Sequence, residues 1–496
     1  MTDPLLAARR RMRGGAGRAV GVLLLAALTA CGTQLDPDSV METRGGPQQT
    51  AAVSAGQVLD TPVAAPLDEA TSPDVVAGTA PVDSSAAAPQ AVTPDQGAED
   101  QQAAGADSEA TDASAEDSTA DCTDIPNQQG ITDDTITIAN VSDISGPVPG
   151  VFQAAQDATT AFAASINAGG GLCGRQLKVI ALDSRADAGA NQIAYAQACD
   201  QAFAAVGSMS VFDQGAATAG KCGLPDLHAV AVSPEAFNCP TCFGAAAINP
   251  GLQAGAMPKF VLEKYGDAAE NVALLYVNIN GVTAAAEGLA QAWRKTGVDI
   301  TYMQPIDVAE FNYIAYVERM KELDVELVHY IGPYQFTIRL QQAMAQQKFE
   351  PVAFIQDQTI YDQKYVDEAG DVAEGTVVYG GHDLFTSPRN EEMQTYLAWL
   401  QQVKPGENPT PYGVYAWSAA RLFADLVIKL GSELTQESLV RAIGQVDEWT
   451  GHGLTSPQYV GPKKTGECIK VIKLEGGVWK QISPGDYYCG PSIPIR

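Results

Sequence analysis

The sequence lacks the short motifs that accompany most enzymatic chemistry. Its 496 residues contain no GxSxG element for a nucleophilic serine, no HExxH pair for zinc and no P-loop for nucleotide phosphates. The four histidines, His228, His329, His382 and His452, are scattered without the spacing of metal ligands. We therefore expect a protein that is not an enzyme and that needs no metal or cofactor.

Long hydrophobic runs and basic clusters are also missing. The apolar stretch 19–28 is about half as long as the roughly 20 residues that a membrane-spanning helix needs. The net charge is −29, and Lys and Arg do not cluster after residue 31. A chain of this charge repels anionic surfaces, so we expect no nucleic-acid partner.

The first 31 residues have the pattern of an export signal. Five arginines between residues 9 and 18 precede the apolar stretch, and small residues follow it. The four residues Leu28-Thr29-Ala30-Cys31 resemble a bacterial lipobox. This resemblance implies removal of residues 1–30 and a lipid on Cys31 that anchors the protein to the outer face of the cell membrane. An ordinary signal peptide is the alternative, and the paired arginines also hint at twin-arginine export.

The next segment, residues 32–121, contains no aromatic residue. It holds 17 acidic residues, eight prolines and a single basic residue, Arg44. Such a segment cannot bury enough apolar surface to offset its backbone entropy, so we expect residues 31–121 to be a disordered tether. An acidic tail that binds cations or basic partners is the alternative.

Eight cysteines follow Cys31, an even number that favours disulfides in an exported domain. Their order along the chain suggests four local pairs: Cys122–Cys173, Cys199–Cys222, Cys239–Cys242 and Cys468–Cys489. The sequence Cys239-Pro-Thr-Cys242 is also compatible with a redox dithiol or half of a zinc site. We favour the structural bridge because the sequence has no second CxxC.

From residue 122 onward, short strand patterns alternate with longer helix patterns. Strands are expected at 135–141, 177–182, 204–207 and 228–232, and again at 272–277, 298–303, 327–331 and 352–355. Helices are expected at 152–167, 190–203 and 216–222, and again at 251–265, 283–296, 313–323 and 335–347. This alternation predicts an α/β fold with two Rossmann-like lobes, each built on a parallel sheet, with a break near Pro250.

Three amphipathic helices are expected next, at 390–403, 414–430 and 436–444, followed by a hairpin at 469–474 and 478–482. With no strands between them, these helices should pack on the two lobes. The simplest path crosses back to lobe 1 near Gly381 and returns to lobe 2 for the hairpin. Lobe 1 is then residues 122–250 with about 383–448, and lobe 2 is residues 251–382 with about 449–496.

Several short motifs occur here in a specific order. They are Ser145-Gly146-Pro147, Ile166-Asn167-Ala168-Gly169-Gly170-Gly171, Gly174-Arg175-Gln176-Leu177 with Asp183, Val230-Ala231-Val232-Ser233-Pro234, and Tyr415-Ala416-Trp417-Ser418-Ala419-Ala420. In this order they resemble the motifs of type I periplasmic solute-binding proteins of the branched-chain amino-acid family, the receptor subunits of ABC importers. The resemblance spans 122–496 and implies a Venus-flytrap fold with inter-lobe crossovers, which passes a small-molecule solute to an ABC permease.

Ligands of open parallel sheets bind outside the carboxyl ends of the strands, often at helix N-termini. In a cleft between two lobes, the carboxyl ends of strands from both lobes face the same space. Lobe 1 offers Ser145, Gly146, Ser210, Val211, Phe212, Asp213, Glu235 and Phe237 as ligand-binding candidates. Lobe 2 offers Asn278, Asn280, Tyr334, Gln335, Asp357, Gln358 and Tyr361. Helix capping is the alternative role, above all for Ser145 and Asp213.

The candidate residues also bear on the ligand. The resemblance implies that lobe 1 holds the carboxylate of an amino acid and that an acid near Asp357 or Gln358 holds its ammonium. Asp213 would repel such a carboxylate, so we expect a neutral, amide-like, aromatic or apolar solute rather than a plain branched-chain amino acid. We also expect a monomer. The alternatives are a sensor of the same fold that signals through a separate membrane protein, and a structural lipoprotein with a vestigial cleft.

Overall fold

The computed structural model describes residues 122–146, 149–150 and 152–495. The expected leader, the lipid-bearing Cys31 and the tether lie outside these residues. Within the described part of the chain, no helix is both long enough and apolar enough to cross a membrane.

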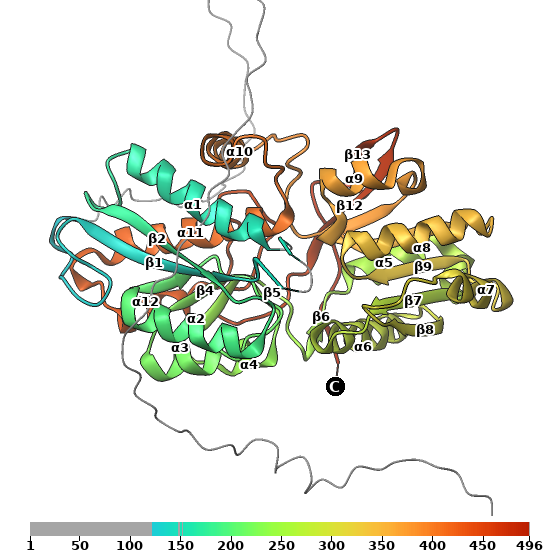
Figure 1. The fold of residues 1–496 in the computed structure, drawn as a ribbon, viewed down its shortest axis with the longest axis horizontal. Coiled ribbons are helices and arrows are strands. Elements are labelled where there is room, and N and C mark those ends of the chain that lie inside the picture. Colours follow the sequence, from blue (N-terminus) through green and yellow to red (C-terminus); the bar gives the residue numbers. More distant parts are fainter. Residues whose placement is uncertain (1–121, 147–148, 151, 496) are drawn as a thin grey trace, which may run out of the picture. The chain divides into compact units, whose positions relative to one another are not determined.

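Lobe 1 is built on a five-stranded parallel sheet with the order β2-β1-β3-β4-β5. Its strands are β1 (Thr135–Ser142), β2 (Gln176–Asp183), β3 (Ala204–Val206), β4 (Asp226–Ala231) and β5 (Cys242–Ala247). Helices α1 (Gln153–Ala168) and α11 (Pro411–Leu430) pack on one face, and α2 (Ala188–Gln201) and α3 (Ala216–Cys222) pack on the other (Figure 1). The short α4 (Pro234–Asn238) connects β4 to β5.

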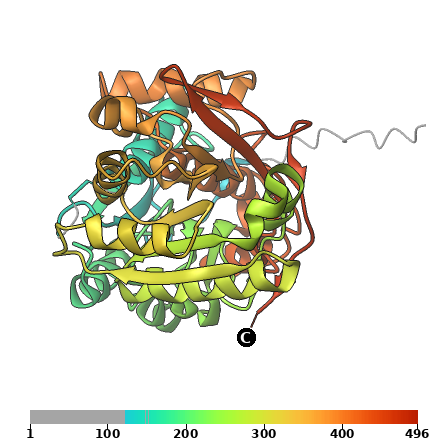
Figure 2. The same cartoon turned by 90° about the vertical axis from the view of Figure 1, so that its right-hand side faces the viewer.

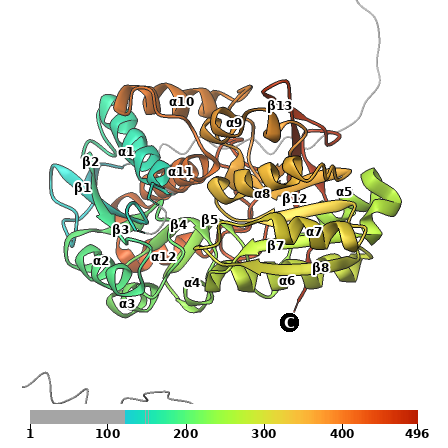
Figure 3. The same ribbon diagram turned by 45° about the vertical axis from the view of Figure 1, so that its right-hand side comes forward.

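Lobe 2 repeats this strand order and extends it. The parallel strands β7 (Val272–Val277), β8 (Ile300–Ile306), β9 (Leu327–Ile331), β10 (Ala353–Asp357) and β11 (Val377–Gly380) are arranged β8-β7-β9-β10-β11. The antiparallel hairpin β12 (Cys468–Glu475) and β13 (Val478–Gln481) adds to β11 and is the red ribbon of Figure 2. The helices of this lobe, labelled in Figure 3, are α5 (Ala256–Tyr265), α6 (Asn280–Thr296), α7 (Ile314–Glu322), α8 (Tyr334–Gln346) and α9 (Gln363–Ala369).

The late helical block belongs to lobe 1. Helix α10 (Glu391–Val403) and α11 contact α1, and α12 (Gln436–Ile443) contacts α11. Each helix begins at a capping side chain: Asn390 for α10, Thr410 for α11 and Thr435 for α12 accept hydrogen bonds from backbone N–H groups of the first turn. The expected α/β fold with two parallel sheets is therefore confirmed, and the sequence signals that delimit these helices are local.

Several elements differ from the expectation. Strands β5 and β11 were not expected, because the Cys-Phe-Gly-Ala-Ala-Ala of β5 has few β-branched residues and β11 has only four residues. The helix expected from Gly251 begins at Ala256 instead. Residues Leu252–Gln253 form β6, which pairs with β15 (Ile493–Pro494) near the end of the chain. Such a long-range pairing leaves no local signal.

The segment after α12 contacts both lobes. The indole N–H of Trp449 donates to Ser418 Oγ of α11 at 2.8 Å, and the N–H of Gly461 donates to the carbonyl of Val446. Residues 449 and 461 therefore lie beside lobe-1 segments, whereas Ser456 donates its backbone N–H to the carbonyl of Gly381 and its hydroxyl to that of Cys468, the first residue of β12. The other crossings lie at 248–255 and after Gly380.

The structure joins the eight described cysteines in four disulfides. The pairs are Cys122–Cys173, Cys199–Cys222, Cys239–Cys242 and Cys468–Cys489, the same pairs that the order along the chain suggests. Cys468 and Cys489 are also partners in the antiparallel pairing of β12 with β14 (Tyr488–Cys489).

Candidate functional site

A cavity of about 220 Å³ lies where strand ends from the two lobes meet. Lobe 1 contributes the carboxyl ends of β4 and β5, with Val230 and Ala247 in the lining. Lobe 2 contributes the last residues of β9, β10 and β11, which are Ile331, Asp357 and Gly380. This is the edge at which open parallel sheets bind their ligands, so the topology alone places a binding site here.

Apolar and aromatic side chains make up most of the lining. Helix α6 contributes Leu289 and Trp293, and Met257 of α5 faces the same space. Tyr412 and Tyr415 reach it from α11, a helix of lobe 1. The cavity therefore offers a hydrophobic surface with hydroxyl and amide groups at a few points, as small-molecule sites usually do.

Asp357 is the one charged side chain among the described residues that line the cavity. One carboxylate oxygen accepts a hydrogen bond from the backbone N–H of Thr359 at 2.9 Å. Burial raises the pKa of Asp357, and the bond from Thr359 opposes this rise only in part. Asp357 can therefore accept a hydrogen bond from a ligand and, once protonated, donate one.

Two contacts from α11 hold the loop after β10 in place. The Tyr415 hydroxyl donates to Gln358 Oε1 at 3.2 Å, and the hydroxyls of Tyr412 and Thr359 are 3.2 Å apart. Both contacts connect a lobe-1 helix to a lobe-2 loop beside Asp357. The polar side of the cavity is therefore positioned by both lobes.

The lobe-1 hydroxyls that could hold a ligand carboxylate are already engaged. Ser145 Oγ donates to Asp183 at 2.5 Å, and Ser210 Oγ donates to the buried Asp143 at 2.9 Å. Ser233 Oγ donates to Asp213 at 2.6 Å. Each hydroxyl therefore has an acceptor within lobe 1 itself; for Ser210 the carbonyl of Phe212, at 3.0 Å, is a second one.

None of the eight lobe-1 candidates lines this cavity. Gly146 is next to the Arg185 carbonyl, and a Cβ at this position would come within 2.2 Å of the carbonyl oxygen. The close approach of the two backbone segments therefore requires glycine here. Val211 donates its backbone N–H to Asp143 at 2.9 Å. Phe212 is half-buried in the same loop, and Glu235 and Phe237 lie on α4.

Asp213 is not among the residues that line the cavity. Its side chain is 2% exposed, and burial raises its pKa. The chain after β3 places the Asp213 carboxylate against the Ser233 hydroxyl.

Among the lobe-2 candidates, Asp357 and Gln358 line the cavity. The Tyr334 hydroxyl donates to Glu368 at 3.0 Å, and the Tyr361 ring stacks on Phe385 with a centroid distance of 4.0 Å. The remaining candidates, Asn278, Asn280 and Gln335, lie at the start of α6 or α8 or just before it and are not in the lining.

Sequence reasoning missed the residues that form the apolar wall. Tyr415 was noticed only as part of a motif that opens a long helix, although an aromatic residue in the first turn of a helix can face a cleft. Tyr379 belongs to β11, which was not expected. Trp293 lies near the C-terminal end of α6, where its apolar character indicates only a core position.

Metal-ligand side chains gather at one place among the described residues, outside this cavity. Asp226, His228 and Cys242 lie within reach of one another in β4 and β5. Cys242 is bonded to Cys239, so its sulfur is not a thiolate in this state. Among the described residues, the cavity lining contains no cluster of three such side chains.

Comparisons with known proteins agree with this architecture. The family model described as "Periplasmic binding protein" matches residues 135–469. No curated protein matches the chain. A fatty acid ABC transporter substrate-binding protein from Thermomonospora curvata is 14% identical, with a TM-score of 0.64 over 74% of this chain and 95% of that one.

Two further solved structures share the fold. The branched-chain amino acid transporter substrate-binding protein LivJ from Streptococcus pneumoniae, in complex with isoleucine, is 16% identical, with a TM-score of 0.60 over 71% of this chain and all of that one. A solute-binding protein of an ABC transporter from R. palustris, in complex with benzoate, is 14% identical, with a TM-score of 0.60 over 73% of this chain and 98% of that one. With two parallel sheets of equal strand order, a cavity at their facing strand ends and a family match over most of the folded region, the chain belongs to the periplasmic binding protein family.

Proposed function

We propose that this protein captures a small solute in the cavity between its lobes and delivers it to an ABC importer. The observation that carries the proposal is the cavity itself, which is bounded by strand ends of both sheets and by α6 and α11. A ligand that contacts both lobes stabilises their closed arrangement and can thereby present a new surface to a permease.

The solute is a neutral molecule with an apolar or aromatic body and one hydrogen-bonding group directed at Asp357. Trp293, Leu289 and Met257 supply the apolar contacts. The lining offers no Lys, Arg or His among the described residues, and Ser145, Ser210 and Ser233 donate to carboxylates of their own lobe. A ligand carboxylate would be buried beside Asp357 without a partner, which is costly.

This proposal departs from the ligands named for the similar solved structures. Those ligands are isoleucine, benzoate and, for the transporter class, fatty acid. All three ligands have an apolar body, which suits the wall of the cavity, and all three also carry a carboxylate. The absence of a basic side chain from the described lining supports the neutral solute over these acids.

Calorimetry with a matched pair of probes tests the proposal. Benzamide and benzoate have similar size and differ mainly in charge, so we expect benzamide to bind about tenfold more tightly or better. Leucine, isoleucine and valine should not bind in the micromolar range. Micromolar binding of any of these three amino acids, or of benzoate over benzamide, would contradict the neutral solute.

A substitution in the cavity refines the test. Asp357→Asn keeps the shape of the side chain but replaces one acceptor oxygen by an NH2 donor. The affinity for the preferred neutral probe should therefore fall by about ten- to a hundredfold. Asp367→Asn, on the exposed side of α9, is the control and should leave binding unchanged. Equal affinities of the two variants would exclude Asp357 from the site.

The protein is exported and held at the membrane by a lipid on Cys31. The arginine-rich start, the short apolar stretch and Leu28-Thr29-Ala30-Cys31 support this part of the proposal. Cys31→Ala should release the protein from the membrane fraction, whereas Cys31→Ala protein that stays membrane-bound would contradict the anchor.

A further inference from the structure

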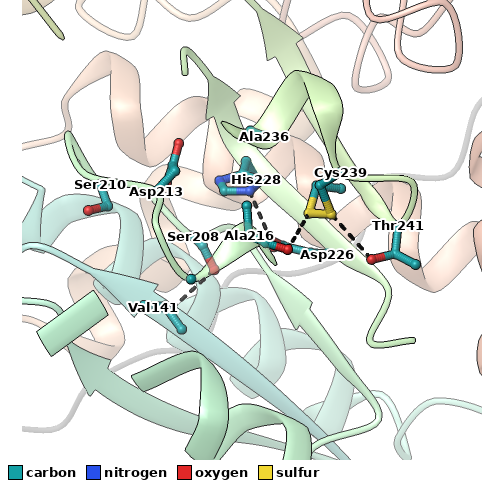
Figure 4. A network of polar contacts seen from close by, with 12 residues as sticks. Val141, Ser208, Ser210, Asp213, Ala216, Asp226, His228, Ala236, Cys239 and Thr241 are labelled. Carbon is teal, nitrogen blue, oxygen red and sulfur yellow. Dashed lines mark hydrogen bonds and ion pairs between the residues drawn. A yellow bond between two sulfur atoms is a disulfide. The ribbon is translucent and has the colours of Figure 1, made fainter. Parts of the chain in front are cut away.

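A second group of functional side chains lies inside lobe 1, away from the cavity. Asp226 and His228 are two residues apart on β4, so both side chains point to the same face of the sheet. Cys242 opens β5 directly opposite Asp226 in the parallel register. In Figure 4 the His228 ring, the Asp226 carboxylate and the sulfur atoms of the Cys239–Cys242 disulfide converge.

Asp226 is fully buried and poorly satisfied. The imidazole Nε2 of His228 lies 2.9 Å from one carboxylate oxygen, but no donor among the described residues makes a well-formed hydrogen bond to either oxygen. The Tyr195 hydroxyl is buried in the same network, where burial and the nearby Asp226 carboxylate raise the pKa of this tyrosine well above its ordinary value. A carboxylate and an imidazole, both able to bind a metal ion, therefore lie side by side in the interior of lobe 1.

The distances fit a metal ion. One ligand atom each of Asp226, His228 and Cys242 lies within 4.8 Å of the others, and Cys239 Sγ is bonded to Cys242 Sγ. In the disulfide neither sulfur is a thiolate, so the oxidised protein offers only two metal ligands, Asp226 and His228. Reduction would supply two thiolates, for a total of four ligands.

We propose that Asp226, His228, Cys239 and Cys242 bind one zinc ion when the Cys239–Cys242 disulfide is reduced. Two sulfurs, one nitrogen and one oxygen form a donor set that zinc accepts in tetrahedral geometry. This proposal is independent of the solute and of the importer. It makes the short CxxC loop a site with two alternative states, a disulfide or a metal centre.

The exchange balances with a dithiol as the reductant. The dithiol is oxidised to its own disulfide, the Cys239–Cys242 bond breaks, and each cysteine gains one proton and one electron. Zinc then displaces the two thiol protons, and a proton from His228 if the imidazole is charged. The oxidised protein regains the bridge when the metal leaves.

Nearby charges suit a centre of this composition. Zinc with two thiolates, one carboxylate and a neutral imidazole carries a net charge of −1. The Lys463 ammonium donates to the carbonyl of Cys239 at 2.7 Å and to that of Phe237 at 3.2 Å, so one cation lies beside the CxxC loop. Lys463 belongs to the segment that returns toward lobe 2, so the metal state would also be adjacent to an inter-lobe connection.

Cobalt binding gives a direct test on the full chain. Reduced protein under anaerobic conditions should bind one Co²⁺ per chain with a thiolate charge-transfer band and the intense visible bands of four-coordinate cobalt. Zinc should displace the cobalt and remove the bands. The oxidised protein should show neither band.

Variants separate this site from adventitious binding to other thiols. His228→Asn should weaken cobalt binding by about ten- to a hundredfold and alter the visible bands. His452→Asn is the matched control, because His452 pairs with Asp425 at 2.8 Å on the surface, and it should leave the spectrum unchanged. The double variant Cys199→Ser with Cys222→Ser should also leave it unchanged.

One further measurement does not depend on the folding of any variant. X-ray absorption at the zinc edge of the reduced wild-type protein should report two sulfur and two nitrogen or oxygen ligands. The proposal is overturned if zinc is coordinated by four sulfurs, if no stoichiometric metal binds, or if the cobalt spectrum persists when Cys239 and Cys242 are both changed to Ser.

Discussion

His228 in lobe 1 and His329 in lobe 2 both lie on interior strands of parallel sheets, and both side chains are essentially unexposed. Their surroundings differ completely. His228 is 2.9 Å from the Asp226 carboxylate, whereas His329 packs against the Trp293 ring and is 3.2 Å from the Tyr379 hydroxyl. The strand pattern that predicts burial is the same for both residues, but it carries no information about charge.

The two environments move the histidine pKa in opposite directions. Burial alone would lower the pKa of His228, but Asp226 and Asp213 outweigh it and raise that pKa. Nothing opposes burial at His329, so its pKa falls to about 3. Lobe 1 therefore contains a buried ionic network beside its disulfide loop, and lobe 2 contains a neutral imidazole under the wall of the ligand cavity.

The largest expected effect comes from removing the charge partner of His228. Asp226→Asn leaves a buried imidazolium without its closest counter-ion, so the free energy of unfolding should fall by about 3–5 kcal/mol at neutral pH. Urea unfolding of the oxidised protein measures this. A loss below about 1 kcal/mol would mean that the Asp226–His228 pair is not ionic.

The pH dependence of the same variant sharpens the comparison. The folded-state pKa of His228 is raised, so its stabilising contribution is complete below the ordinary value of 6.5 and is lost as the pH rises through the higher folded-state pKa. The stability difference between wild type and Asp226→Asn should therefore shrink on the alkaline side. A difference that grows there would contradict the assignment.

The second largest effect concerns His329. Its pKa is lowered, so it costs stability as the pH falls, whereas the His228 contribution is lost as the pH rises. Its folded-state pKa of about 3 lies below 6.5, so the unfolded chain takes up the proton first and stability falls as the pH drops below 6.5. Between pH 6.5 and about 4 this histidine alone should cost on the order of 3 kcal/mol. His329→Phe should remove that part of the acid sensitivity, and acid unfolding curves of the two proteins measure the difference. Parallel curves would show that His329 is not held neutral.

The smallest effect is expected on the surface. His452 pairs with Asp425 at 2.8 Å, a geometry close to that of the His228 pair, but both side chains are partly exposed. His452→Asn should change the free energy of unfolding by at most about 1 kcal/mol in urea denaturation. A loss as large as that of Asp226→Asn would show that burial does not decide the strength of these pairs.

Most of the fold follows from local patterns in the sequence. The alternation of short apolar runs with amphipathic helices predicts both sheets, and Asn390 or Thr435 begins a helix by capping chemistry alone. The pairing of Leu252–Gln253 with Ile493–Pro494 was not predictable in this way, because the partner strands are far apart in the sequence. The hydrogen bond from Trp449 to Ser418 is a contact of the same kind.

The candidate site is predictable only where it follows from topology. Asp357 and Gln358 follow β10, and the rule that ligands bind at strand ends finds them. The same rule selects Ser145 and Ser210, but their hydroxyls donate to Asp183 and Asp143, acids contributed by other parts of the lobe-1 sheet. A pattern read along one strand does not show which neighbouring side chain takes the proton of a serine. Tyr412 and Tyr415 reach the cavity from the other lobe, so no local signal links them to it.

Native mass spectrometry of the gently purified protein, followed by identification of the released small molecule, tests the central claim most directly. We expect one small molecule per chain, neutral, with an apolar or aromatic body and a single hydrogen-bonding end. A released branched-chain amino acid or another carboxylate would contradict the chemistry assigned to the cavity. A ligand-free protein whose melting temperature responds to no compound in a panel of small solutes would contradict the solute-binding function itself.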